Sequence, residues 1–261
     1  MDLDLLSKWP DLVRGLIARV GAEWESHGSL RSWRKGEHGG VVSDLDLRLD
    51  VAIRQTFSTY YPDVPVLSEE LGWLYPIDSV SATWAAVVDP VDGTDSLVAR
   101  QRTWWTSVAL VEEGVPRAGL MHQPTTGKTH DSMAPRRYHR ASKAIGLSPD
   151  QIEADETHGL RQRLKRNQFS VLPIPHAVEK VAAVVEGRCE GCIYLPSATS
   201  PGWHSWDLAA CLAVAQSSHL VLRAADGSDI RLGDLAAYYH IPWICSTDVA
   251  SWDVIRAAVA T

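Results

Sequence analysis

The chain of 261 residues is long enough for one large domain or two small ones, and its composition, 45% hydrophobic and 22% charged, is ordinary for a globular protein. A formal net charge of −7 argues against a nucleic-acid polymer as partner, because such a protein needs a basic face. No apolar run reaches the roughly 18 residues that span a membrane, and residues 1–6 do not resemble a secretory signal, so we expect a cytoplasmic protein.

The N-terminal part of the chain begins with two stretches of helical spacing. Apolar residues recur every three or four positions in residues 3–27 and again in 42–57, which predicts two amphipathic helices. Short apolar runs bounded by turn residues then predict strands, the last two of which are expected to form an antiparallel pair. These strands are expected at 64–67, 84–88, 107–112 and 117–122.

The pattern weakens after residue 131, where basic residues gather, and we place a soft boundary just before this region that divides the chain into 1–125 and 126–261. Beyond it, Asp226-Gly227 predicts a hairpin between strands at 221–223 and 230–232. Further strands are expected at 192–195 and 243–245, and helices at 177–186, 206–215 and 254–259. Because helices and strands alternate but hairpins are mixed in, the sequence predicts a layered α/β or α+β fold.

The segment with the most chemical content is residues 89–94, Asp-Pro-Val-Asp-Gly-Thr, which directly follows the strand at 84–88. Asp, Pro and Gly all favour turns, so a plain acidic turn is one interpretation. The other is a site for a hard cation such as Mg²⁺, which prefers carboxylate and carbonyl oxygens, beside backbone N–H groups of Gly93 and Thr94 that bind an anion. An EF-hand is excluded, because its alternating acids and downstream Glu are missing.

Two further acidic segments complete a pattern. Glu69 and Glu70 follow the strand at 64–67, and Asp207 follows Trp206 at the start of a predicted helix. The three segments in this order resemble the inositol monophosphatase superfamily of metal-dependent phosphatases, which includes nucleotide bisphosphate, fructose bisphosphate and some histidinol phosphatases. The resemblance implies an alternating αβαβα sandwich, a homodimer and hydrolysis of phosphate monoesters.

The resemblance also implies a set of metal ligands. Glu69, Asp89 and the carbonyl of Val91 would hold one Mg²⁺, and Asp89, Asp92 and Asp207 a second, with Asp89 bridging the two ions. A third, more weakly bound Mg²⁺ would be coordinated by Glu69 and water.

Other residues of the pattern are implied to act on water and substrate. Thr94 and Asp46 would orient the attacking water, and Glu70 would fix a metal-bound water or its own loop. His176 and Ser200 stand where inositol phosphatases carry a Gly-Ser segment and an acidic residue, and both differences weaken an inositol assignment. The residues expected at the substrate are Asp92, Gly93, Thr94, His176, Ser200 and Asp207.

The leading hypothesis is a Mg²⁺-dependent phosphatase that acts on a small polyol, sugar or nucleotide phosphate and needs no membrane. Lys180 favours a narrower hypothesis, a phosphatase of nucleotide bisphosphates such as adenosine bisphosphate. The sequence also leaves open a catalytically silent relative that binds metal and phosphate, and a Ca²⁺-stabilised structural domain. Cys189 and Cys192 form a lone Cys-x-x-Cys pair, which we interpret as small buried side chains rather than as a redox or metal site.

Overall fold

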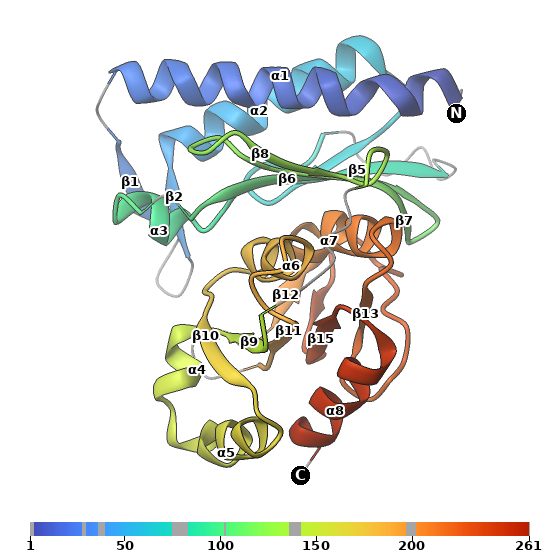
Figure 1. Ribbon diagram of the computed structural model, residues 1–261. Coiled ribbons are helices and arrows are strands. Elements are labelled where there is room, and N and C mark those ends of the chain that lie inside the picture. The colour runs from blue at the N-terminus through green and yellow to red at the C-terminus, as the bar shows by residue number, and fades with distance from the viewer. Residues whose placement is uncertain are drawn as a thin grey trace.

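The computed structural model describes residues 3–27, 30–35, 40–74, 83–101, 103–135, 142–196 and 202–260, and its elements form five layers (Figure 1). Two helices cover one sheet, two more lie between the sheets, and three cover the outer face of the second sheet. This arrangement confirms the predicted αβαβα sandwich. The helices, in layer order, are α1 (Leu3–His27), α2 (Asp44–Tyr60), α6 (Ala177–Val185), α7 (Ser205–Ser217), α4 (Pro149–Glu153), α5 (His158–Arg166) and α8 (Val249–Val259).

The first sheet has six strands in the order β4-β3-β5-β6-β7-β8, and only the β3–β5 pairing is parallel. Its strands are β3 (Val66–Ser68), β4 (Gly72–Trp73), β5 (Trp84–Asp92), β6 (Trp105–Glu112), β7 (Val115–Gln123) and β8 (Lys128–Asp131). In β5 every residue after the first is buried, because helices cover both faces of the sheet. The β6–β7 pair confirms the predicted hairpin.

The second sheet has five strands in the order β10-β9-β11-β15-β13. They are β9 (Ala144–Leu147), β10 (Ser170–Pro173), β11 (Gly191–Tyr194), β13 (Val221–Ala224) and β15 (Trp243–Ser246). Two short ribbons, β1 (Ser32–Arg34) with β2 (Val41–Ser43) and β12 (Trp203–His204) with β14 (Tyr238–Tyr239), lie outside the two sheets, as does the short helix α3 (Thr94–Val98).

The expected hairpin between residues 221–223 and 230–232 is wrong. A turn does form at Gly227, whose N–H donates to the carbonyl of Ala224 over 2.9 Å. However, β13 pairs with β15, and the backbone N–H of Leu232 donates instead to the carbonyl of Gly114, in the turn between β6 and β7. Leu232 is fully buried between the sheets, so its burial takes the segment away from β13.

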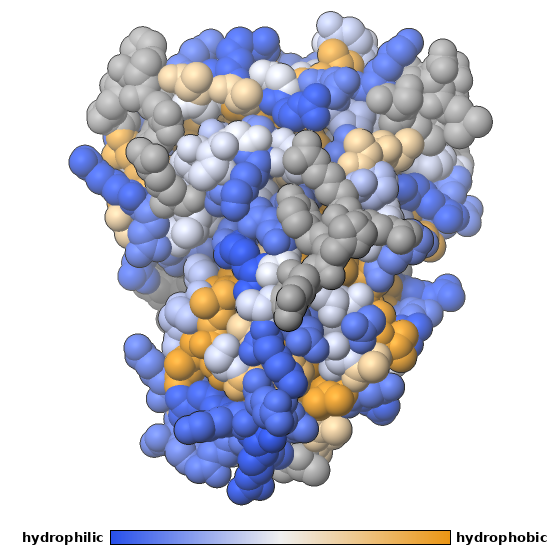
Figure 2. Space-filling model, viewed as in Figure 1, coloured by the Kyte–Doolittle hydropathy of each residue, from blue (hydrophilic) through white to orange (hydrophobic). Residues whose placement is uncertain are grey.

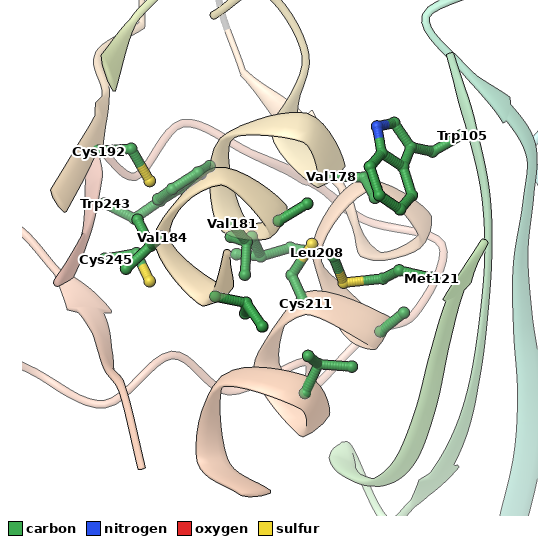
Figure 3. Packing of buried hydrophobic residues seen from close by; sticks show 14 of the residues in the cluster. Trp105, Met121, Val178, Val181, Val184, Cys192, Leu208, Cys211, Trp243 and Cys245 are labelled. Atoms are coloured by element: carbon green, nitrogen blue, oxygen red, sulfur yellow. The ribbon is translucent and has the colours of Figure 1, made fainter. Parts of the chain in front are cut away.

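The two central helices make close contact with the first sheet. Figure 3 shows side chains of α6 and α7 between Trp105 and Met121 of the first sheet and Cys192 and Cys245 of the second. A Cβ added at Gly119 of β7 would lie 2.7 Å from the carbonyl oxygen of Ala210 in α7. A residue without a side chain is therefore required for this approach. The layer positions α7, and with it the acid at its start.

In Figure 2 the surface around α5, at the bottom of the view, is mainly hydrophilic, and hydrophobic patches lie above it, at the level of the second sheet. Within the described part of the chain, no helix combines the length and the apolar character needed to cross a bilayer.

The first sheet extends to Asp131, so β8 lies after the boundary that the sequence suggested at residue 125.

A buried ion pair holds the turn after β3, the turn that carries Glu69. The guanidinium of Arg54 and the hydroxyl of Ser68 both donate to the carboxylate of Asp50, and Arg54 also donates to Ser68 Oγ over 3.1 Å. The backbone N–H of Leu71 donates to the same carboxylate over 3.2 Å. Helix α2 thereby fixes both ends of the turn that follows β3.

Replacing Asp50 by Asn leaves the Arg54 guanidinium buried without a counter-charge. We expect the free energy of unfolding to fall by about 3 kcal/mol, since breaking a buried pair leaves one charge uncompensated. Arg117→Met is the control, because the Arg117–Glu112 pair is much more exposed and its loss costs less than about 1 kcal/mol. Urea denaturation measures both, and equal losses in the two variants would contradict the assignment.

Candidate functional site

The acids of the site converge at the end of β5. The register of β5 against β6 shifts between Asp89 and Asp92, and this irregularity turns the last residues of the strand out of regular pairing. The parallel neighbour β3 ends beside it, where the N–H of Glu69 donates to the carbonyl of Val88 over 3.2 Å. The first turn of α7 brings Asp207 to the same place.

These residues line one cavity of about 160 Å³. The cavity contains most of the residues that the sequence singled out. Its lining consists of Gly40, Val41, Glu69, Asp89, Val91, Asp92, Gly93, Thr94, Asp95, His176 and Asp207. Asp46 contacts the cavity through Thr94, and Glu70 lies beside Glu69, whereas Ser200 is outside the described residues.

The three aspartates fit a divalent cation. Oxygens of Asp89, Asp92 and Asp207 all lie within 4.8 Å of one another. Asp89 Oδ1 is buried and has no hydrogen-bond partner among the described residues. Burial, followed by the charges of Glu69 and the other acids, raises the pKa of Asp89 well above its ordinary value. A cation bound by the carboxylate oxygens would reduce the repulsion among the acids and would give Asp89 Oδ1 a partner.

Backbone donors hold two of these carboxylates in place. Asp92 accepts the N–H of Val178, at the start of α6, over 3.0 Å. Asp207 accepts the N–H of His204, the residue before α7, over 2.6 Å. Because each bond uses one oxygen of its carboxylate, the other oxygen stays available to a ligand in the cavity.

A chain of hydrogen bonds leads from the cavity to the start of α2. The hydroxyl of Thr94 lies 2.8 Å from Asp46 Oδ1 and 3.1 Å from the carbonyl oxygen of Val91. The other oxygen of Asp46 accepts the N–H of Ser43 over 2.9 Å and the Ser43 hydroxyl, which completes the capping box of α2. Burial raises the pKa of Asp46, while the bonds from Ser43 and Thr94 lower it.

Lys35 joins the two glutamates after β3. Its Nζ lies 2.7 Å from a carboxylate oxygen of Glu69 and 2.7 Å from one of Glu70. Burial lowers the pKa of Lys35, but the attraction of both glutamates outweighs that effect and raises it overall. Burial, followed by the charge of Glu69, raises the pKa of Glu70 to about 7 against the opposing effect of Lys35. Glu70 thus contacts the site through Lys35.

The sequence did not reveal the partner of His176. Its Nε2 lies 2.6 Å from the hydroxyl of Ser96 in α3, and its ring covers Gly93 so closely that a Cβ there would lie 2.6 Å from its Cδ2. Burial lowers the pKa of His176 to about 4, so the ring is neutral at pH 7. No spacing rule links residues 96 and 176, because the contact exists only once α3 and the segment before α6 meet.

A second cavity, of about 250 Å³, adjoins the first and shares Asp92, His176 and Asp207 with it. The sequence had singled out its buried cation, Lys180, but not Tyr194 and Trp243, which form part of its wall. The remaining lining residues are Ser148, Pro149, Asp150, Pro175, Ala177, Lys180, Tyr194, Gly202, Trp203 and Trp243. Two adjoining cavities, one acidic and one that combines aromatic residues with a buried lysine, provide separate places for a phosphate and for the group attached to it.

Comparison with protein families agrees with this geometry. The model of the inositol monophosphatase family matches residues 12–231. The chain belongs to this family. It is a phosphoric monoester hydrolase, and the metal dependence of the family agrees with the acidic cluster.

Individual relatives cover different shares of the chain. Inositol-1-monophosphatase of Synechocystis is 22% identical over 87% of this chain and 82% of its own length. Histidinol-phosphatase of Mycobacterium tuberculosis is 28% identical over 71% and 75%. The 3'(2'),5'-bisphosphate nucleotidase CysQ of Escherichia coli is 34% identical, but only over 32% of this chain and 33% of its own.

Solved structures show the same fold. The inositol monophosphatase from Anabaena superposes with a TM-score of 0.71 at 17% identity, covering 98% of this chain and 97% of its own. The inositol monophosphatase of Thermotoga maritima gives 0.72 at 18% identity, with 96% and 97% covered. At these identities the likeness supports the fold, and the substrate has to be argued from the site.

The acidic cluster predicts a specific pH dependence of stability without metal. Burial raises the pKa of Asp92 from 3.8 to about 7, so between these values the folded chain binds more protons than the unfolded chain. This contribution is present at low pH and is lost as the pH rises through 7. Thermal melting in a chelator should therefore show the wild type losing stability relative to Asp92→Asn between about pH 4 and about pH 7. Parallel curves for the two proteins would refute it.

Proposed function

We propose that this protein is a Mg²⁺-dependent phosphatase that hydrolyses a small phosphate monoester by direct attack of water. The observation that carries the proposal is the group of Asp89, Asp92 and Asp207 beside the Thr94–Asp46 pair. A phosphate ester carries negative charge, so a site of carboxylates alone repels it. The same acids loaded with cations attract it. The acidic cluster therefore supports a site at which bound metal ions bind the phosphate of the substrate.

The proposed Mg²⁺ ligands are carboxylate and carbonyl oxygens of residues that line the acidic cavity. Glu69, Asp89 and the carbonyl of Val91 would hold one Mg²⁺, and Asp89, Asp92 and Asp207 would hold a second, with a third ion expected near Glu69. When bound, these ions neutralise charge on the phosphoryl group and lower the pKa of water. Lys35 holds Glu69 and Glu70 in place beside the ions.

The chain's own residues orient the reacting groups. If the Thr94 hydroxyl donates to Asp46, its oxygen lone pairs point away from that bond and can accept a hydrogen bond from water. Asp46 Oδ1 keeps the hydroxyl in this direction as its acceptor, since Ser43 satisfies the other oxygen of Asp46. The turn at Gly93, with a φ of 100°, exposes backbone N–H groups that can donate to phosphate oxygens.

The substrate is a polyol, sugar or nucleotide phosphate with room for its leaving group in the second cavity. A nucleotide bisphosphate is a specific candidate, supported by the local similarity to CysQ and by Lys180 in the cavity wall. A catalytically silent relative is a weaker candidate, because the complete acidic set supports turnover. Assaying a panel of inositol, sugar, histidinol and nucleotide phosphates with Mg²⁺ decides among them.

Asp89→Asn and Asp207→Asn each remove one charge from the metal site. We expect kcat to fall by about 10³-fold or more with p-nitrophenyl phosphate and Mg²⁺, because metal ions contribute several kcal/mol to such reactions. Asp253→Asn removes the same charge from the exposed face of α8 and should leave kcat unchanged. Circular dichroism checks that all three variants fold. Near-normal turnover in either site variant would exclude the mechanism.

Thr94→Ala removes the hydroxyl that orients water, and we expect kcat to fall by about 10²-fold or more while KM changes little. Thr94→Ser keeps the hydroxyl and should recover turnover to within about tenfold of the wild type. Steady-state kinetics with saturating Mg²⁺ measures both. Equal losses in Ala and Ser variants would show that the methyl group, through packing, is what matters at this position.

Homodimer formation and a cytoplasmic location complete the proposal. The family resemblance supports the dimer. Cys189, Cys192, Cys211 and Cys245 are free and buried, which agrees with a reducing compartment. Sedimentation at micromolar concentration tests the dimer directly.

A further inference from the structure

A cavity of about 450 Å³ lies apart from the metal site. The start of β7, the C-terminal half of α7, strand β13 and the segment 229–231 bound it, so the two sheets and the helix layer between them all contribute to its wall. It shares no lining residue with the acidic cavity or with the cavity that contains Lys180. A concave space of this volume is large enough to bind a small molecule.

The cavity lies where the expected hairpin does not form. β13 is an edge strand of the second sheet and pairs with β15 on one side only. The segment 229–231 leads to Leu232, whose N–H donates to the carbonyl of Gly114, so this segment does not cover the outer side of β13. Both segments line the cavity. The edge of the second sheet is therefore left without a partner from its own chain.

The apolar part of the wall continues the core of the protein. Leu212 of α7, Leu222 of β13 and Ile230 are only partly buried, and each packs against the apolar cluster between the sheets. The same three side chains line the cavity. Apolar side chains that stay partly exposed in a concave surface rimmed by polar residues favour a ligand with an apolar body.

The charged residues of the wall are Arg223, Asp229 and Arg231, which together leave a net positive charge in a chain whose net charge is −7. Nε of Arg223 lies 3.4 Å from Oδ1 of Asp229, and the two side chains are 45% and 77% exposed, so this pair is weak. Arg231 is exposed and forms no ion pair within the part of the chain that the structure describes. A guanidinium group binds a carboxylate through two parallel hydrogen bonds.

A peptide strand fits this place less well than a small molecule does. β13 has only four residues, Val221–Ala224. The N–H of Ala224 already donates to the carbonyl of Ser228 over 3.0 Å. Few backbone groups of β13 therefore remain for the hydrogen bonds that hold an added strand.

We propose that this cavity binds a small amphiphilic carboxylate, with its apolar body against Leu212, Leu222 and Ile230 and its charged group at Arg231 and Arg223. The site is independent of the proposed phosphatase function, because it shares no residue with the metal site. The ligand would nevertheless contact α7, the helix whose first turn carries Asp207.

Octanoate, 1-octanol and acetate test the two halves of the site separately, because octanol lacks the charge and acetate lacks the apolar body. Calorimetric titration uses the full chain in a chelator, so that no metal ion at the acidic cluster can bind the carboxylate. We expect octanoate to bind with a Kd of about 0.1 mM and octanol to bind about tenfold or more weakly. Acetate should show no measurable binding.

Arg231→Met removes the charge and should weaken octanoate binding by about tenfold or more, while octanol changes less than about twofold. Arg166→Met, on the exposed surface of α5, makes the same change in net charge and should alter neither. Val115→Trp places a large side chain in the cavity from an exposed position at the start of β7 and should weaken both ligands by about tenfold or more. Thermal melting checks that the variants fold.

Three results would overturn the proposal. Octanoate that binds the wild type no more tightly than octanol would show that the arginines do not select the ligand. Unchanged octanoate affinity in both Arg231→Met and Val115→Trp would place the binding elsewhere. A wild type that binds no octanoate would leave the cavity to another occupant, and sedimentation would identify a second copy of the chain if Val115→Trp dissociated a dimer.

Discussion

The closeness of buried like charges at the end of β5 is the constraint on which the rest of the structure depends. Asp89, Asp92 and Asp207 place their oxygens within 4.8 Å of one another, in surroundings that favour their protonated forms. A single strand could not hold the three carboxylates this close together. The irregular end of β5 and the start of α7 must be fixed by packing that outweighs the repulsion, and the apolar layer between the two sheets provides this packing.

The supporting contacts share a common form. Backbone N–H groups of Val178 and His204 hold Asp92 and Asp207, and the capping box of α2 holds Asp46. The Asp50–Arg54 pair fixes the turn that carries Glu69. Asp46, Asp92 and Asp207 are thus held at helix ends, and Glu69 in a turn fixed by helix α2, which limits how far these acids can move away from their neighbours.

Much of the fold could be predicted from the sequence because its signals are local. Helical spacing, the β6–β7 hairpin and acids directly after apolar runs all lie within a few residues of one another, and the predicted layers are confirmed. The hairpin expected at 230–232 failed because burial of Leu232 between distant elements outweighed the local turn signal. Strands such as β9, four residues long and buried on both faces, carry no alternation from which they could be recognised. The contacts of His176 with Ser96 and of Lys180 with Ser148 depend on tertiary structure alone, and no local sequence pattern predicts them.

The His176 ring over Gly93 has a consequence for how this enzyme could be altered. Two independent barriers, a φ of 100° and an aromatic ring 2.6 Å from where a Cβ would stand, keep position 93 a glycine. Substituting His176 removes only the steric barrier and leaves the Ser96 hydroxyl without its hydrogen-bond partner. Laboratory evolution toward new substrates would therefore have to change residues 93, 96 and 176 together, because a useful change at one position requires changes at the others.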